Sequence, residues 1–182
     1  MSSKPSGTTA LVTLADPRSP ASEAYRTLRT NIQFSSLDRP LRTILITGAD
    51  AGEGKSTTLA NLAVVMAQGG KRVIAVDCDL RRPALHTLFG LPAEPGLTTA
   101  ILDSASAVAP LKTSVDGLRL VPSGPLPPNP SELLGSHQFQ ATLDRLTADA
   151  DIVLLDAPPI VAVSDAAVLA TKVDGVILVV NA

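Results

Sequence analysis

Short apolar runs alternate with segments of helical periodicity along most of this 182-residue chain. The apolar runs are continuous and rich in β-branched residues, as is typical of strands buried on both faces; they are residues 41–47, 72–77, 118–121, 152–155 and 175–180. Helices are expected at residues 20–34, 55–68, 137–147 and 164–171, with shorter pieces at 83–89 and 98–102. Strands that alternate with helices predict an α/β fold, in which a parallel sheet carries helices on both faces as a three-layer α/β/α arrangement.

The composition of the first 20 residues differs from that of the rest of the chain. Residues 1–20 are rich in Ser, Thr and Pro and are expected to form a flexible N-terminal arm, whereas residues 21–182 would form one domain. The first expected helix places Ala24, Leu28 and Ile32 at intervals of four, so this stripe would pack on the rest of the domain.

The first apolar strand is followed by a glycine-rich turn, a Lys-Ser pair and a helix, which is the arrangement of a phosphate-binding P-loop. Lys55 would contact the β- and γ-phosphates of a nucleotide, and the Ser56 hydroxyl would bind Mg²⁺. The strict pattern has Gly where this chain has Ala49, a departure that we expect to be tolerated. The expected nucleotide-binding residues are Gly48, Ala49, Asp50, Ala51, Gly52, Glu53, Gly54, Lys55, Ser56 and Thr57.

Carboxylates close two of the expected strands. Asp77 and Asp79 lie two residues apart, so in an extended chain they share a face while Cys78 faces the core. Asp156 ends the apolar run IVLL. Ligands of open α/β sheets bind beyond the carboxyl ends of the strands, which would bring these acids to the phosphate loop of a P-loop NTPase-type fold. There one acid would hold Mg²⁺ and another would accept a hydroxyl proton.

Composition narrows the range of partners. The net charge is −2 and aromatic residues make up 2%, which argues against electrostatic capture or base stacking of nucleic acid. No apolar run is long enough to cross a membrane, so direct membrane insertion is not expected.

Three segments together resemble a known family. TGADAGEGKSTTLANLA, VIAVDCDLRRPALH and DIVLLDAPPI are similar to the three Walker-type motifs of the bacterial tyrosine kinases, the autokinases of capsule and exopolysaccharide synthesis. SEAYRTLRTNI resembles the Glu-x-x-Arg-x-x-Arg helix of that family, and PSGPLPPNPSELL resembles its proline-rich loop. The resemblance runs from about residue 14 to the last residue.

The resemblance implies an ATP-dependent protein-tyrosine autokinase that transfers the γ-phosphate between subunits. Lys55 and Ser56 would bind ATP and Mg²⁺; Asp77 would be the base, with Asp79 nearer the metal and Asp156 as the third acid. The expected catalytic residues are thus Lys55, Asp77, Asp79 and Asp156. The expected metal ligands are Ser56, Asp79 and Asp156. The residues expected to build a homo-oligomeric ring are Glu23, Arg26 and Arg29.

The family also implies a partner, a transmembrane polysaccharide co-polymerase that activates the kinase from a separate chain. The protein would then be cytoplasmic and membrane-associated through that partner.

Two alternatives stay open. The related MinD/ParA-like cell-division and partition ATPases carry an extra lysine at the position of Asp50, so this loop lacks their signature. A non-kinase, ATP-gated assembly switch is the second alternative, because the family's tyrosine-rich tail is absent and Tyr25 is the single tyrosine. Tyr25 is expected to be a packed helix residue rather than a phosphate acceptor. The chain stops just after the last expected strand, which favours a truncated or shortened member.

Overall fold

The computed structural model describes residues 11–35, 40–103 and 109–181. Within them a six-stranded sheet has the order β3-β4-β2-β5-β1-β6. Its strands are β1 (Thr43–Gly48), β2 (Val73–Asp77), β3 (Leu111–Lys112), β4 (Leu118–Val121), β5 (Ile152–Asp156) and β6 (Gly175–Val179). Neighbouring strands are parallel except at the β3–β4 edge, which is antiparallel. The predicted α/β architecture is therefore confirmed, with one short antiparallel strand that the sequence did not indicate.

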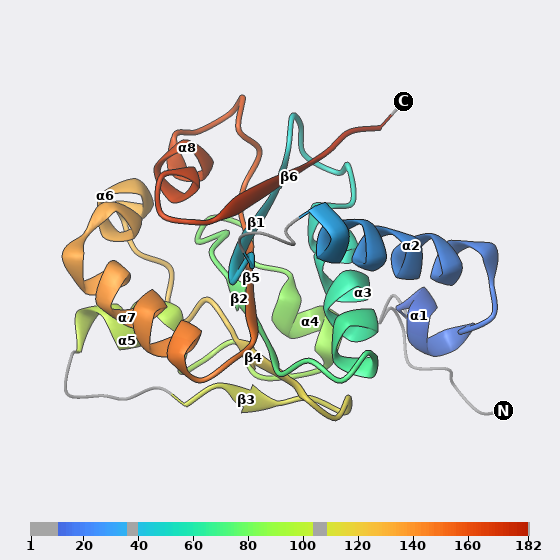
Figure 1. Ribbon diagram of the computed structural model, residues 1–182. Helices are drawn as coiled ribbons and strands as arrows, with labels where there is room; N and C mark the ends of the chain where they lie inside the picture. The colour runs from blue at the N-terminus through green and yellow to red at the C-terminus, as the bar shows by residue number, and fades with distance from the viewer. Residues whose placement is uncertain (1–10, 36–39, 104–108, 182) are drawn as a thin grey trace, which may run out of the picture.

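Helices cover both faces of the sheet (Figure 1). One layer holds α1 (Val12–Ala15), α2 (Pro20–Ser35), α3 (Lys55–Gln68) and α4 (Leu85–Phe89). The other holds α5 (Leu97–Leu102), α6 (Pro130–Gly135), α7 (His137–Ala148) and α8 (Asp165–Ala170). Among the helices of the described residues, none is long and apolar enough to cross a membrane.

The strands alternate their side chains between two buried clusters. Ile44 and Ile46 of β1 pack under α3, whereas Leu45 between them packs under the opposite layer. In β2, Ala75 and Val76 divide in the same way. Because both faces of the central strands are buried, the interior positions of these strands are almost all apolar, which explains the continuous apolar runs of the sequence; Thr43 and Thr47 of β1 and the terminal Asp77 and Asp156 are the polar exceptions.

The N-terminal segment differs from the expected arm. Residues 1–10 lie outside the described residues, but Leu11 and Thr13 are buried, with 4% and 0% of their surface exposed. The Thr13 backbone N–H and hydroxyl both donate to Asn61 Oδ1 of α3, at 3.0 and 2.8 Å. The arm prediction is therefore wrong from residue 11 onward, because α1 satisfies a buried amide of the phosphate-loop helix.

The inward face of α2 is also shifted from the expected stripe. Tyr25, Leu28 and Ile32 pack against the cluster under α3, whereas Ala24 is exposed. An α-helix has about 3.6 residues per turn, so residues separated alternately by three and four positions stay on one face. Residues separated only by four positions drift towards a neighbouring face. Tyr25 is thus a packed residue, as the sequence predicted.

Candidate nucleotide and phosphotransfer site

The phosphate loop connects β1 to α3 through glycines with positive φ. Gly52 and Gly54 have φ of 85° and 81°, a region that residues with a Cβ rarely adopt. Lys55 begins α3 directly after the loop, so the backbone N–H groups of the first helical turn point towards the loop. Free N–H groups and a helix N-terminus together form an anion-binding site. The expected nucleotide-binding residues 48–57 run from the end of β1 through this loop into the first turn of α3.

The loop is closed by its own side chains. The Glu53 Oε2 atom accepts the Asp50 backbone N–H at 3.0 Å, and Lys55 Nζ donates to the Asp50 carbonyl oxygen at 3.3 Å. Gly48 makes room for this, since a Cβ there would lie 2.6 Å from Glu53 Oε2. The bracing role of Glu53 was not predicted. The Lys55 side chain is folded back over the loop, where it is 8% exposed.

Asp77 and Asp156 end neighbouring parallel strands at the same level. They are register partners of β2 and β5, and both are fully buried. Asp77 Oδ2 accepts the backbone N–H groups of Ala84 and Leu85, each at 3.0 Å. Asp77 Oδ1 and both carboxylate oxygens of Asp156 are buried without a hydrogen-bond partner in the part of the chain that the structure describes. Such oxygen atoms are costly unless a ligand binds them.

Burial is the largest influence on the pKa values of Asp77 and Asp156. It raises the pKa of Asp77 to about 7, against the opposing effect of the Leu85 and Ala84 N–H groups. Burial also raises the pKa of Asp156 well above its ordinary value, and the nearby charge of Asp77 adds to the effect. The Ser56 hydroxyl and the positive charge of Lys55 act on the pKa of Asp156 in the opposite direction. Perturbed acids of this kind are typical of functional sites.

Asp79 completes the group and shapes the turn after β2. Its Oδ1 accepts the backbone N–H groups of Arg81 and Arg82, at 3.2 and 2.9 Å. Its charge contributes to the raised pKa of both Asp77 and Asp156, so the three acids lie close together, as the strand pattern predicted. Cys78 is fully buried in the core on the other face, and burial raises the pKa of its thiol, which fits the expected inert role.

The donor set fits a magnesium ion that is shared with phosphate. Within the described ranges, no three His, Cys, Asp or Glu side chains converge into a self-sufficient metal site. Mg²⁺ in nucleotide sites is held by one or two protein oxygen ligands together with phosphate oxygens and water. The unpartnered oxygens of Asp156, with Ser56 beside them, provide such a partial set.

An ion pair between the exposed Arg81 and the buried Asp165 was not predicted. Arg81 donates from Nε and Nη2 to the two carboxylate oxygens of Asp165, at 2.8 and 3.1 Å, and Asp165 also accepts from the Ser131 hydroxyl. Burial alone would raise the pKa of Asp165, but Arg81 and Ser131 hold it below its ordinary value. The two residues are 84 positions apart, so no local pattern links them.

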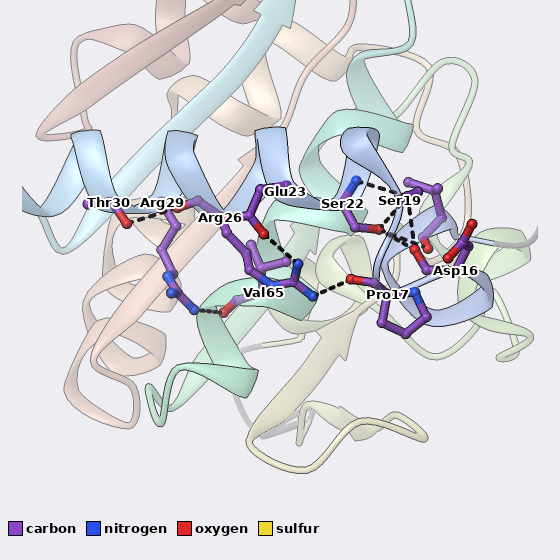
Figure 2. Close-up of polar contacts among 10 residues, drawn as sticks. Asp16, Pro17, Ser19, Ser22, Glu23, Arg26, Arg29, Thr30 and Val65 are labelled. Atoms are coloured by element: carbon purple, nitrogen blue, oxygen red, sulfur yellow. Dashed lines mark hydrogen bonds and ion pairs between the residues drawn. The ribbon is translucent and has the colours of Figure 1, made fainter.

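The three residues expected to form an intersubunit contact differ in their contacts within the chain (Figure 2). Arg29 Nη1 donates to the Val65 carbonyl oxygen near the end of α3, at 2.8 Å. Arg26 pairs with Glu23 at 2.9 Å and also donates to the Pro17 carbonyl oxygen, at 2.6 Å. Both arginines are therefore engaged within their own chain, whereas the Glu23 side chain is 68% exposed.

Fold and site together define a P-loop nucleotide-binding protein. The family profile of the CobQ/CobB/MinD/ParA nucleotide binding domain matches residues 44–177. The chain is 46% identical over 172 residues to the tyrosine-protein kinase YwqD of Bacillus subtilis (strain 168), covering 94% of this chain and 73% of that protein.

Solved structures agree with the sequence comparison. The chimerical protein CapA2B2 superposes with a TM-score of 0.88 at 38% identity, covering 92% of this chain and 74% of that one. The kinase domain of the Escherichia coli tyrosine kinase ETK gives a TM-score of 0.88 at 32% identity, covering 97% and 70%. The chain therefore belongs to the CobQ/CobB/MinD/ParA nucleotide-binding family and, within it, to the bacterial tyrosine-protein kinases.

Proposed function

We propose that this chain is an ATP-dependent protein-tyrosine kinase of capsule or exopolysaccharide synthesis. The observation that carries the proposal is the buried pair Asp77 and Asp156, whose unpartnered oxygens lie at the carboxyl end of the sheet with Lys55 and Ser56. A plain phosphate-binding loop needs no such group of acids, whereas phosphoryl transfer needs a metal ligand and a proton acceptor.

ATP is the phosphate donor of the proposed reaction. A tyrosine oxygen forms a bond to the γ-phosphorus, the bond from that phosphorus to the β,γ-bridging oxygen breaks, and ADP leaves with the bond electrons. The phenolic proton passes to Asp77, whose Oδ1 is unpartnered and whose pKa is raised to about 7. Lys55 and the loop N–H groups bind the phosphates. Mg²⁺, held by Ser56, Asp79 and Asp156, would neutralise charge on the phosphate oxygens.

The direct test is phosphorylation of a tyrosine peptide in trans. We expect phosphotyrosine with Mg-ATP, and a loss of at least about a hundredfold in rate for Asp77→Asn, which keeps the shape but not the proton acceptor. Asp144→Asn, on the exposed face of α7, is the matched control and keeps the full rate. Unchanged phosphorylation by Asp77→Asn would show that another group accepts the proton.

The acceptor tyrosine is proposed to come from another molecule. Tyr25 is the one tyrosine of the chain and packs against the cluster under α3. That packing also supports the alternative, an ATP-gated assembly switch. Tight Mg-ATP binding with no phosphotransfer to any tyrosine peptide, together with nucleotide-dependent oligomers, would favour the switch. Turnover stimulated by DNA or lipid would instead revive the MinD/ParA-like ATPase.

The proposed assembly is a homo-oligomeric ring that docks on a transmembrane activator at the cytoplasmic side of the membrane. Glu23 is the exposed member of the α2 trio, so Glu23→Gln would weaken an intersubunit contact and remove within the chain only the exposed ion pair with Arg26. Arg29→Ala would also remove the hydrogen bond to the Val65 carbonyl oxygen, so its effect would combine a weakened intersubunit contact with a loosened α2. Sizing of each variant with and without Mg-ATP tests the ring; a wild-type chain that stays monomeric with the activator present would argue against it.

A further inference from the structure

A cavity of about 320 Å³ opens at Asp79, two residues after the end of β2. It lies between the tip of the phosphate loop at Ala51, the turn after β2, and the segment after β5. Its size is at the lower end of ligand pockets, which span about 300–1,000 Å³, so it suits one side chain rather than a whole nucleotide. Asp79 lines it, which connects the cavity to the expected phosphate position.

One wall of this cavity is hydrogen-bonded to β1, the strand that precedes the phosphate loop. Pro158, Pro159, Ala162 and Val163 form an apolar side. The Thr47 hydroxyl donates to the Pro158 carbonyl oxygen at 2.8 Å, and the Ile160 N–H donates to the Gly48 carbonyl oxygen at 2.9 Å. The apolar side therefore keeps its place relative to the loop without needing a ligand.

The two arginines at the cavity differ in what they can bind. The guanidinium of Arg81 is neutralised by the buried carboxylate of Asp165. Arg82 is exposed and uses its backbone N–H to bind Asp79. Its side chain forms no ion pair with the residues that the structure describes. Arg82 is thus an exposed cation that lines the cavity and forms no ion pair within the described part of the chain.

We infer that this cavity receives the tyrosine side chain of the phosphate acceptor and that Arg82 recognises an acidic residue beside that tyrosine. The inference rests on the proposed kinase function and names the class of its substrate, a tyrosine in an acidic peptide segment. An aromatic ring buries a large apolar surface, which the prolines and Val163 accept, while its hydroxyl group is directed to the side lined by Asp79. A guanidinium binds a carboxylate through paired N–H groups, which gives the charge preference.

The first experiment measures binding without chemistry. Two short fluorescent peptides, one with Glu and one with Gln on either side of a single Tyr, are titrated by anisotropy in the presence of Mg-ADP. We expect the acidic peptide to bind about threefold to tenfold more tightly at low salt, which is the range of an ion pair at a partly exposed site. The preference should shrink as salt screens the charge.

Two variants and one control locate the site. Arg82→Gln should abolish the preference for Glu over Gln, and Ala162→Trp should fill the cavity and weaken both peptides while Mg-ADP binding stays. Arg145→Gln, an exposed arginine on α7, should change neither peptide. Equal affinity for the two peptides in wild type, or an unchanged preference in Arg82→Gln, overturns the inference. Competition between Mg-ADP and the peptide does so as well, because the cavity would then belong to the nucleotide.

Phosphotransfer kinetics separate this inference from the kinase proposal. Arg82→Gln should raise KM for the acidic peptide and leave kcat and KM for ATP unchanged, as expected for a residue that binds the acceptor but not the reacting atoms. Binding of the acidic peptide through Arg82 without any phosphorylation would contradict the kinase proposal and support the peptide site. Phosphorylation of both peptides with equal KM would support the kinase proposal and contradict the peptide site.

Discussion

Asp77 and Asp156 lie side by side as register partners on neighbouring parallel strands, both fully buried. The parallel β2–β5 pairing is what brings them together, because both strands end at the same edge of the sheet. Asp77 has one oxygen bound by the start of α4, whereas neither oxygen of Asp156 has a partner among the described residues. Asp156 is therefore the acid that depends most on a ligand.

Replacing Asp156 should separate metal binding from stability. Asp156→Asn removes a buried carboxylate without a partner, so we expect the nucleotide-free protein to be at least as stable as wild type. Wild type should gain stability from Mg-ATP, about 2.7 kcal/mol at a ligand concentration of a hundred times Kd. Thermal unfolding with ATP and Mg²⁺, compared with ATP and EDTA, measures this gain. The Mg²⁺-dependent part should vanish in Asp156→Asn and persist in Asp144→Asn; its survival in Asp156→Asn would exclude this carboxylate as a ligand.

Substitutions at two adjacent positions of the phosphate loop should differ in their effect on ATP affinity. Gly48→Ala places a methyl group 2.6 Å from Glu53 Oε2 and 2.9 Å from the Val179 carbonyl oxygen, so the loop must shift. We expect ATP affinity to fall by about tenfold or more, the equivalent of about 1.4 kcal/mol. Ala49→Gly restores the strict loop pattern and should leave the affinity within about threefold of wild type. Titration of a fluorescent ATP analogue compares them, and equal affinities would contradict the bracing of the loop by Glu53.

Thr13 and Asn61 should be energetically coupled. Thr13→Val keeps the shape but removes the 2.8 Å bond from the hydroxyl to Asn61 Oδ1 inside the core, at an expected cost of about 1–3 kcal/mol. The cost should be smaller in the Asn61→Ala background, and a double-mutant cycle by urea unfolding yields the difference. Thr171→Val, on an exposed hydroxyl, is the control. Additive effects within about 0.5 kcal/mol would mean that α1 does not depend on this contact.

The contact between Thr13 and Asn61 could not be predicted from the sequence, whereas the phosphate loop and the acids could. The phosphate loop and the acids were predictable because each is a local motif placed by one strand end, and parallel pairing then brings the motifs together. The contact of Thr13 with Asn61 spans 48 positions and that of Arg81 with Asp165 spans 84, so neither leaves a periodic signal. A Ser- and Pro-rich composition indicated an arm, but the buried Leu11 and the hydrogen bonds from Thr13 to Asn61 attach this segment to α3.

The Arg72–Asp151 pair should make stability depend on acid pH. The hydrogen bond from the Arg72 side chain lowers the pKa of Asp151 to about 2, below its ordinary value of about 3.9. A lowered folded-state pKa adds stability above about pH 4 that is lost as the pH falls towards 2. Asp151→Asn should therefore be less stable than wild type at pH 7, and the difference should shrink between pH 4 and pH 2. Urea unfolding across this range measures it, and a difference that stays constant would contradict the pKa.

The Arg81–Asp165 pair should affect both stability and acceptor binding. Asp165→Asn leaves Arg81 without its buried carboxylate, and we expect a loss of about 2 kcal/mol in unfolding free energy, whereas Asp144→Asn should cost little. The freed guanidinium of Arg81 lies at the same cavity as Arg82, so a folded Asp165→Asn protein should bind the Glu-flanked tyrosine peptide more tightly than wild type. Arg81→Gln should show the stability loss without this gain. Anisotropy below the unfolding transition compares the variants, and a weaker affinity in Asp165→Asn would show that the ion pair shapes the cavity rather than neutralising its charge.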